Sequence, residues 1–235
     1  MSRSFIFGGE SSAAYHVYVF EGDTYNAPSR SYTSSAIPGK NGALLVNNKR
    51  FDNVQHSFAC FVVEDFETNI QAFRNFLNSK IGYQRLEDTA HSDEYYMACY
   101  KNNFVVTPSN NLDMGKVTVT FDRKPQRFLK SGETAVTLTS DGSITNPTRF
   151  SAKPLIRIYG TGRVGVGSNA ITVATADGYT DVDCEIMEAY KGTQSRNAYV
   201  TIQDNDFPEL KPGANGITLG TGVERVDITP RWWRL

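Results

Sequence analysis

Most of the chain alternates apolar and polar side chains or carries short apolar runs, and both patterns are typical of β-strands. Residues 116–121 alternate cleanly, with Val117, Val119 and Phe121 on one side. Residues 57–63 and 155–159 are nearly continuous apolar or β-branched runs, which predict buried strands. Further strands are expected at residues 43–46, 95–100, 104–107, 134–139, 170–174, 183–189, 198–202, 223–228 and 231–235.

One segment has a helical period instead. Phe66, Ile70, Phe73 and Leu77 recur at spacings of three and four residues, which places them in one apolar stripe. Asp65 precedes the stripe as a candidate N-cap, and a glycine follows the segment. The sequence therefore predicts a mainly β protein with a single amphipathic helix.

The pattern also divides the chain. The helix lies before residue 129, whereas every later segment is a predicted strand bounded by turns, as in an all-β sandwich. We therefore expect a first domain over residues 1–129, with a β-sandwich plus the helix, and a second over residues 130–235. The sequence leaves open whether the last strand returns to pack on the first domain.

Two segments of the first domain are candidates for contact with another subunit. Residues 15–20 carry apolar or aromatic groups on both faces, so the predicted strand is covered on both sides, by its own domain or by a neighbouring chain. Residues 27–42 are rich in serine and too poor in apolar residues to fold alone. They are either a surface loop or an arm that becomes ordered on another subunit. The candidate interface residues are Tyr15, Val17, Tyr18, Val19, Tyr32, Ile37 and Pro38.

Composition narrows the possible partners. The 235 residues are 40% hydrophobic and 21% charged, an ordinary globular balance, and the net charge of -1 gives no general attraction to nucleic acid or anionic membrane. No apolar run approaches the roughly 18 residues of a membrane span. The apolar stretch at residues 5–7 is too short for a secretory signal, so we expect the protein to stay in the cytosol until it is assembled. Cys60, Cys99 and Cys184 are expected to be buried reduced thiols.

Three patterns are similar to known binding sites, but each lacks a feature that the site requires. Residues 160–165 match G-x-G-x-x-G, but β-branched residues follow where a dinucleotide site needs a helix, so a glycine-rich hairpin is expected. Residues 177–183 gather three carboxylates without the order of a calcium loop, which indicates a solvated turn. His16, His56 and His91 are far apart and have no zinc-ligand spacing.

Three other groups of side chains give no catalytic site. Glu185 and Glu188 would point to opposite faces of one strand, which argues against a glycosidase pair. Trp232 and Trp233, with Tyr190, are expected to pack in the core, although stacking on a sugar is the alternative. The remaining group is basic and is not gathered with aromatics into a nucleic-acid groove: Lys49, Arg50, Arg123, Lys124 and Arg127. Most of these residues are expected to be solvated, and the sequence leaves open whether some line a tube lumen through which DNA passes. No catalytic, cofactor or metal site is predicted.

Several segments, taken in order, resemble the distal tail proteins of long-tailed phages (siphophages). They are Ile37-Pro38-Gly39-Lys40-Asn41-Gly42-Ala43-Leu44-Leu45, Gly82-Tyr83-Gln84-Arg85-Leu86, Phe121 to Gln126, Asn146 to Ile156, and Phe207 to Asn215 with Pro230-Arg231-Trp232-Trp233. The resemblance implies a ring, usually a hexamer, at the tip of the tail tube. It also implies an N-terminal domain that forms the ring and an outer C-terminal galectin-like β-sandwich.

The role implied by the resemblance is structural rather than enzymatic. Its partners would be copies of itself, the tail tube protein, the hub proteins of the tail tip or baseplate, and receptor-binding proteins. Its location would be the virion tail tip, after assembly in the host cytoplasm. The chain has no room for an inserted carbohydrate-binding module. Two alternatives stay open from the residues alone: a carbohydrate-binding module for host adsorption, and a hydrolase built on a β-sandwich.

Overall fold

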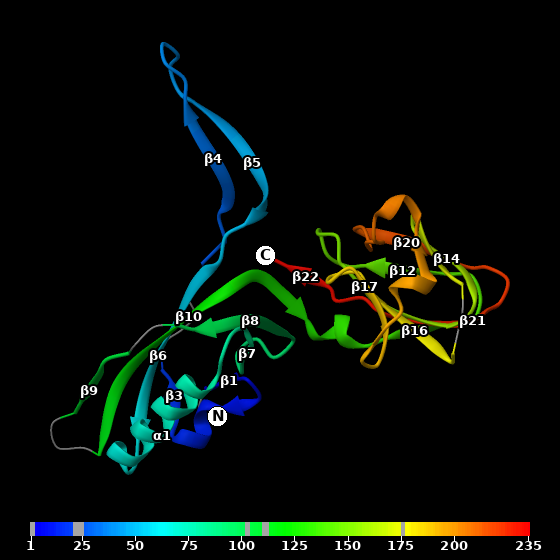
Figure 1. Ribbon diagram of the computed structural model, residues 1–235. Helices are drawn as coiled ribbons and strands as arrows, with labels where there is room; N and C mark the ends of the chain where they lie inside the picture. Colours follow the sequence, from blue (N-terminus) through cyan, green and yellow to red (C-terminus); the bar gives the residue numbers. More distant parts are fainter. Residues whose placement is uncertain (1–2, 21–25, 102–103, 110–112, 175–176) are drawn as a thin grey trace. The chain divides into compact units, whose positions relative to one another are not determined.

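The structure is a computed structural model that describes residues 3–20, 26–101, 104–109, 113–174 and 177–235. It divides into two compact units, which we call unit 1 (residues up to Arg127, with Leu235) and unit 2 (Phe128–Arg234). Strands dominate both units, and the described residues contain one α-helix (Figure 1). The predicted fold class, mainly β with one helix, is confirmed.

Unit 1 is built on one sheet with the strand order β2-β1-β7-β8-β10-β6-β3, and β9 also pairs with β10. The bounds are β1 (Phe5–Phe7), β2 (Glu10–Ser11), β3 (Val17–Val19), β6 (Val54–Val63), β7 (Gln84–Asp88), β8 (Glu94–Tyr100), β9 (Val106–Pro108) and β10 (Met114–Leu129), whereas the last strand, β22 (Trp233–Arg234), belongs to unit 2. Strands β6 and β10 are antiparallel, from Val63 opposite Met114 to Val54 opposite Arg123. Val117, Val119 and Phe121 are buried, as their alternation predicts.

This sheet curls until its two ends face each other. The ring of Phe5 on β1 lies 4.9 Å from that of Phe58 on β6 and 5.4 Å from that of Phe121 on β10, although β7 and β8 separate β1 from β10 in the sheet. The Val19 N–H donates to the Arg3 carbonyl at 2.8 Å, so the start of the chain meets the far end of the sheet. The predicted N-terminal sandwich is thus one curled sheet around an aromatic core.

Helix α1 (Phe66–Ser79) packs against this core. Ile70, Phe73 and Leu77 are buried as the stripe predicts, and Phe76 joins them. The predicted N-cap is wrong, because Asp65 has a φ of 36° rather than the extended backbone of a capping residue, and its side chain makes no cap hydrogen bond. The Phe66 N–H donates instead to Asp113 Oδ1 at 2.8 Å.

Two predictions for the N-terminal strands need correction. The strand expected at residues 15–20 is only β3, since Tyr15 ends the 3-10 helix η1 (Ser12–Tyr15) and His16 has a φ of 54°. The strand expected at residues 43–46 continues as β5 (Ala43–Phe51), which pairs with β4 (Arg30–Ala36). No turn occurs at Asn47, whose Oδ1 accepts the Lys49 N–H at 2.8 Å beside a shift in register.

Unit 2 is a sandwich of two sheets, with strand orders β11-β21-β13-β16-β17-β18 and β12-β20-β14-β15-β19. The bounds are β11 (Val136–Leu138), β12 (Gly142–Asn146), β13 (Leu155–Gly160), β14 (Gly162–Val166), β15 (Asn169–Val173), β16 (Tyr179–Asp183), β17 (Glu188–Lys191), β18 (Gln194–Ser195), β19 (Val200–Ile202), β20 (Gly213–Leu219) and β21 (Val223–Thr229), with 3-10 helices η2 (Lys130–Glu133), η3 (Asn197–Tyr199) and η4 (Gln203–Asn205). Side chains of both sheets, such as Ile156 and Ile217, form one buried core. The strand expected at residues 183–189 is interrupted, since β16 ends at Asp183 and β17 begins at Glu188.

The G-x-G-x-x-G segment is a corner between the two sheets. Strands β13 and β14 belong to different sheets. The expected glycine-rich hairpin is confirmed one strand later, because β14 pairs with β15 from Gly162 opposite Val173 to Val166 opposite Asn169. Gly160 has a φ of +91°, and a Cβ atom there would lie 2.2 Å from the carbonyl oxygen of Gly222. The Thr161 N–H donates to that same oxygen at 2.9 Å. Glycine is therefore required by both the backbone conformation and the close approach of a second chain segment.

Leu77→Asp tests the burial of the helix stripe. Leu77 is fully buried, so an unpaired carboxylate there should lower the free energy of unfolding by several kcal/mol. Asn75→Asp is the matched control, because Asn75 is exposed and its Oδ1 only accepts a hydrogen bond from Gln71. Thermal unfolding measures both, and an unchanged Tm for Leu77→Asp would refute the burial.

Gly160→Ala tests the corner of unit 2. The added methyl group clashes with backbone rather than with a movable side chain, so we expect a loss of about 2 kcal/mol or more in unfolding free energy. Gly216→Ala is the control, since no atom lies within 4 Å of its Cβ position. Equal unfolding midpoints for the two variants in urea would contradict the packing described.

Candidate functional site: an uncovered β-hairpin

Strands β4 and β5 form a two-stranded hairpin that projects from the body of unit 1 (Figure 1). Residues from Tyr32 to Ala36 pair with residues from Asn47 to Ala43. The connecting turn has Gly39 and Gly42 at φ values of +78° and +84°, the left-handed backbone conformation that glycine adopts without strain and that the pair Asn41-Gly42 favours. No other described strand pairs with β4 or β5, so both backbone edges of the ribbon are open.

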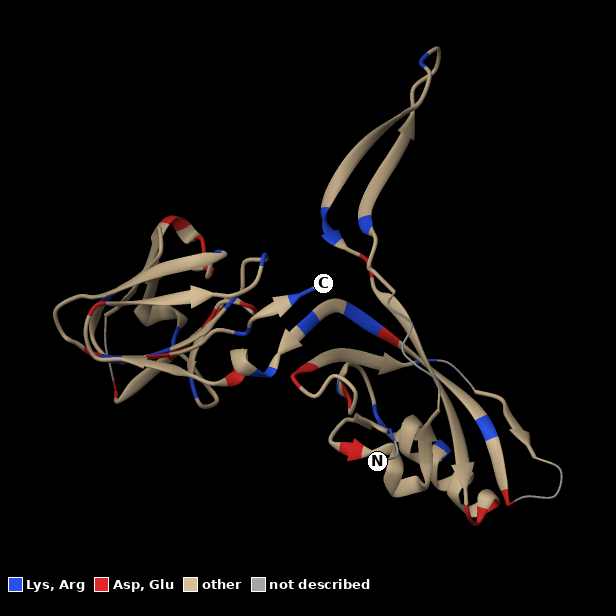
Figure 2. Ribbon diagram, turned by 180° about the vertical axis from the view of Figure 1, so that it is seen from behind, with Lys and Arg blue, Asp and Glu red and all other residues tan. Residues whose placement is uncertain are grey.

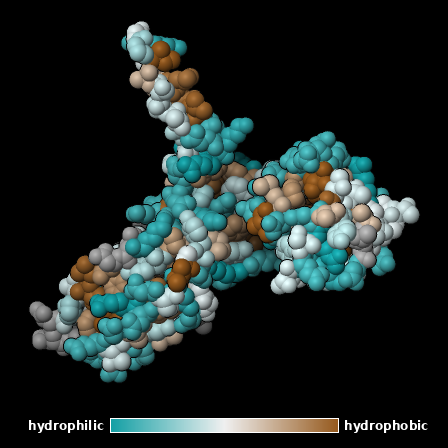
Figure 3. Space-filling model, in the orientation of Figure 1, coloured by the Kyte–Doolittle hydropathy of each residue, from teal (hydrophilic) through white to brown (hydrophobic). Residues whose placement is uncertain are grey.

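Both faces of the hairpin carry uncovered apolar side chains. Because paired residues of an antiparallel ribbon share a face, Tyr32 and Leu45 lie on one side and Leu44 and Val46 on the other. The exposed fractions are 62% for Leu45, 54% for Leu44 and 51% for Val46. Figure 3 shows hydrophobic residues along this hairpin. A ribbon that lay on a single surface would need only one apolar face.

Charge is nearly absent from the hairpin. Between Ser31 and Asn48 the only Lys, Arg, Asp or Glu in the sequence is Lys40, at the tip of the hairpin. Three further basic residues lie at its base: Arg30, Lys49 and Arg50. Figure 2 shows the two strands without charged residues between base and tip. Exposed edge strands of natural proteins usually carry charges that prevent pairing with other chains. The described part of the hairpin lacks such protection along both strands.

The root of the hairpin is held firmly to unit 1. The Asp52 N–H donates to the Ser29 carbonyl at 2.9 Å, and Asn26 Nδ2 donates to the Gln55 carbonyl at 3.1 Å. The Arg30 guanidinium lies 4.7 Å from the centre of the Phe51 ring. The ribbon is therefore anchored at its base while its outer part has no core of its own.

The structure divides the seven predicted interface residues between the hairpin and the body of unit 1. Tyr32, Ile37 and Pro38 belong to the hairpin and its turn. Tyr15 stacks on Phe76 with ring centres 4.9 Å apart. Among the residues of β3, Val17 and Val19 are buried in the core of unit 1, whereas Tyr18 faces outward.

Tyr18 belongs to a group that we call the aromatic patch: Tyr18, Phe20 and Phe61. Phe61 lies on the outer face of the sheet, because its neighbours Cys60 and Val62 are fully buried. Its ring centre lies 6.0 Å from those of both Tyr18 and Phe20. The sequence reasoning missed Phe61, although the apolar run at residues 57–63 already indicated a strand with apolar groups on both faces.

The free edge of β3 is not available for strand pairing. The Ser12 hydroxyl donates to the Val17 carbonyl at 2.9 Å, and the Val19 N–H donates to the Arg3 carbonyl at 2.8 Å. A neighbouring chain would therefore meet this part of unit 1 on the face of the sheet, where the aromatic patch lies.

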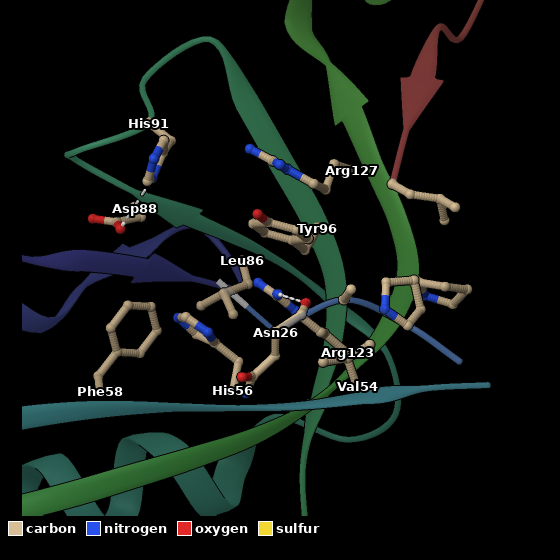
Figure 4. Close-up of a pocket in the computed structure, with 14 residues that line it drawn as sticks. Asn26, Val54, His56, Phe58, Leu86, Asp88, His91, Tyr96, Arg123 and Arg127 are labelled. Carbon is tan, nitrogen blue, oxygen red and sulfur yellow. Dashed lines mark hydrogen bonds and ion pairs between the residues drawn. The ribbon is translucent and has the colours of Figure 1, made fainter. Parts of the chain in front are cut away.

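Near the hairpin root is a small pocket of about 140 Å³ whose lining includes His56, His91, Arg123 and Arg127 (Figure 4). The fold thus brings together two histidines that are far apart in the sequence. The Arg127 guanidinium binds Glu94 through two contacts of 2.6 and 2.9 Å, and the Arg123 guanidinium lies 4.3 Å from the Tyr96 ring centre. Arg123 and Arg127 are exceptions to the expectation that most of the basic residues are solvated, because Arg123 is buried and Arg127 is paired with a buried carboxylate.

A second arginine–carboxylate pair completes this network. Arg3 Nε donates to Asp88 Oδ1 at 3.2 Å, and His91 Nδ1 lies 3.6 Å from Asp88 Oδ2. Arg123 also donates to the Asn26 carbonyl at 3.4 Å, just before the hairpin. The network therefore holds the root of the hairpin against the sheet, and its arrangement is that of a structural cluster of ion pairs.

His56 gives this cluster a pH dependence. Burial, and then the positive charge of Arg123, lower the pKa of His56 from 6.5 to about 4. The folded protein therefore binds this proton less readily than the unfolded chain does. The contribution of neutral His56 to the unfolding free energy is therefore fully present above about pH 6.5 and is lost as the pH falls toward 4.

His56→Gln should remove this component of the pH dependence. In the wild type we expect the unfolding free energy to fall by up to about 3 kcal/mol from this group between pH 6.5 and pH 4. Urea unfolding at several pH values measures the slope, and His16→Gln, which leaves His56 unchanged, should keep it. The same slope in wild type and His56→Gln would show that His56 does not cause it.

In unit 2 two carboxylates of residues 177–183 form ion pairs with arginine side chains of the same chain. Asp181 binds Arg157 at 2.7 and 2.9 Å, and Asp183 binds Arg231 at 2.7 and 2.8 Å. Both aspartates are buried, so the expected solvated turn is wrong for them. Among the described residues, no three His, Cys, Asp or Glu side chains gather as a metal site would require.

The tryptophans and cysteines are placed as predicted. Trp232 is buried in the core of unit 2, and Trp233 stacks on Phe150 with ring centres 4.5 Å apart while its Nε1 donates to the Ser151 carbonyl. Three thiols are free and buried, as expected: Cys60, Cys99 and Cys184. Burial raises the pKa of the Cys60 thiol to about 12. Within the part of the chain that the structure describes, no helix has the length and apolar character of a membrane span.

Comparisons with known proteins identify the fold. The sequence matches no protein-family model, and no curated protein matches it. Among solved structures, the chain is similar over its full length to Dit (gp 19.1) of SPP1, described as a paradigm of the hub adsorption apparatus in phages that infect Gram-positive bacteria. That match has a TM-score of 0.74 at 14% identity and covers 100% of both chains.

Two baseplate structures also match. The baseplate of phage P2 in its activated conformation with Ca gives a TM-score of 0.50 at 13% identity, covering 97% of this chain and 98% of the other. The same baseplate with Sr gives 0.51 at 12% identity, covering 100% and 99%. The resemblance to siphophage distal tail proteins, stated from sequence segments, is thus confirmed at the level of the fold.

Proposed function

We propose that this protein is a structural component of a phage tail tip, a distal tail protein whose copies form a ring between the tail tube and the tip or baseplate proteins. The observation that carries this proposal is the uncovered hairpin, which has open edges, two apolar faces and almost no charge. The full-length fold likeness to SPP1 Dit supports it. The sequence segments shared with that family point the same way.

The mechanism is assembly. A ring of identical subunits requires a heterologous interface whose rotation closes, so each copy must contact one neighbour through one surface and the other neighbour through a different surface. The hairpin is one of these two surfaces. Residues 1–129 would form the ring and residues 130–235 the outer galectin-like sandwich. The family resemblance suggests six copies, with the tail tube protein and the hub proteins as axial partners and the virion tail tip as location.

The carbohydrate-binding alternative has little support from the side chains. Trp232 and Trp233 are used in packing. On the outer face of the larger sheet of unit 2, arginines cover the tyrosine rings that would otherwise be open to stacking on a sugar: Arg157 lies 4.2 Å from the centre of Tyr179 and Arg225 lies 3.9 Å from that of Tyr159. No constellation described above performs catalysis, and we propose a protein without enzymatic activity.

Mass measurement by light scattering tests the ring. The wild type, alone or with tail tube subunits, should form a closed oligomer. Leu44→Lys with Leu45→Lys places a charge on each face of the hairpin and should reduce the mass to that of a monomer, with an unchanged Tm because neither side chain belongs to a core. Thr172→Lys, at an exposed position of unit 2, is the control that should leave the oligomer intact.

Two results would contradict the proposal. A wild type that stays monomeric at high concentration, also with tail tube subunits present, would overturn the ring itself. An intact oligomer in the doubly substituted variant would overturn the role of the hairpin while leaving the ring in place.

A further inference from the structure

We infer that the hairpin of one copy packs on the aromatic patch of the next copy, so that Tyr18, Phe20 and Phe61 form the receiving half of the joint. This inference rests on the proposed ring. It names the receiving surface, which the fold likeness does not, and it commits to a second copy of this chain as the occupant.

The patch is singled out among the exposed apolar side chains of unit 1. Outside the hairpin, the exposed large hydrophobic residues described there are Phe20, Ile81, Tyr83 and Val105. The Tyr83 hydroxyl accepts a hydrogen bond from Asn53 Nδ2 at 2.7 Å. Ile81 lies in the connection after α1, and Val105 lies outside the strands. Phe20 alone of these is in ring contact with apolar neighbours on a sheet face.

The shape of the patch fits a ribbon. Lys116 on β10, Phe61 on β6 and Tyr18 on β3 lie opposite one another in register, so they form a row across three strands. Phe20 continues the patch beside the next row, since its N–H donates to the Ala59 carbonyl at 3.0 Å. A row of apolar side chains across neighbouring strands can receive one face of a two-stranded ribbon, as in the packing of one sheet on another.

The occupied edge of β3 favours face-to-face docking. Because the Val17 carbonyl and the Val19 N–H already have partners within the chain, an added strand would have to displace them. Packing of apolar side chains on the aromatic patch needs no such exchange. The hairpin of one copy therefore packs on the sheet face of the next copy. In this arrangement the open edges of the hairpin stay available for pairing with other strands of the assembly.

Size and charge are compatible with a permanent joint. Strand β4 has seven residues and β5 has nine, and with the turn they approach the roughly 20–30 residues that one side of a standard interface contributes. The hairpin carries no carboxylate, and the ammonium group at the rim of the patch, that of Lys116, lies 5.6 Å from the centre of the Phe20 ring. Docking thus removes few charges from water, which favours association.

Complementation between two defective variants tests the pairing. The donor-defective variant is Leu44→Lys with Leu45→Lys, and the acceptor-defective variant is Phe20→Lys with Phe61→Thr. Each alone should be monomeric by light scattering. An equimolar mixture should give a 1:1 dimer of twice the monomer mass and no ring, because only one intact hairpin and one intact patch can meet.

The outcomes separate the inference from the proposed ring. A ring formed by the acceptor-defective variant, or a mixture that stays monomeric while the wild type forms a ring, would overturn the hairpin-to-patch joint alone. A monomeric wild type would overturn the ring first. Unchanged Tm values for both variants are required, and Phe20→Lys alone, which keeps β6 intact, replaces the double variant if Phe61→Thr unfolds.

Cysteine cross-linking gives a second measurement. Ser34→Cys on the hairpin and Ala59→Cys beside the patch, combined in one chain, should yield a ladder of linked subunits under a mild oxidant. Each single substitution should give at least ten-fold less linked product, and the native thiols are buried and should not contribute. Strong linking by Ser34→Cys alone would show that hairpins meet each other rather than the patch.

Discussion

The closure of the sheet in unit 1 is the constraint on which the rest of that unit depends. Phe5 must reach Phe58 and Phe121 across the curl, and the backbone of Arg3 must meet Val19. These contacts are far apart in sequence, so they hold the N-terminal strands against β6 and β10 and create the aromatic core that α1 covers. They also fix which residues of β3 and β6 face outward, and thereby produce the aromatic patch.

The second constraint is the buried charge at the base of the hairpin. Glu94 and Asp88 are buried and paired with arginines, and Arg123 bonds to the backbone just before β4. Removing one member of such a pair leaves an uncompensated charge, so the network tolerates little rearrangement. A long ribbon without a core is therefore joined to the protein through a rigid base. Its direction is set there and not by packing along its length.

Periodicity predicted the elements that local side chains determine. The stripe of α1 and the alternation of Val117, Val119 and Phe121 could be read directly, and so could the positive φ of Gly42. The misses have long-range causes. The corner at Gly160 depends on Gly222, and the burial of Arg123 depends on Tyr96 and Asn26. The hairpin could be recognised only as a segment too poor in apolar residues to fold alone, since its two strands pair with each other and pack on no core that would give them a regular apolar period.

The same hairpin makes an unassembled subunit prone to aggregation. Its two open backbone edges carry no nearby charge, so strands of other chains can pair with them non-specifically. Leu44 and Leu45 also expose apolar surface on both faces of the ribbon. In the ring proposed above, newly made copies would therefore have to enter the ordered assembly faster than they aggregate. The yield of correctly built particles would then depend on the balance between synthesis and nucleation, with overproduction in isolation leading to insoluble material.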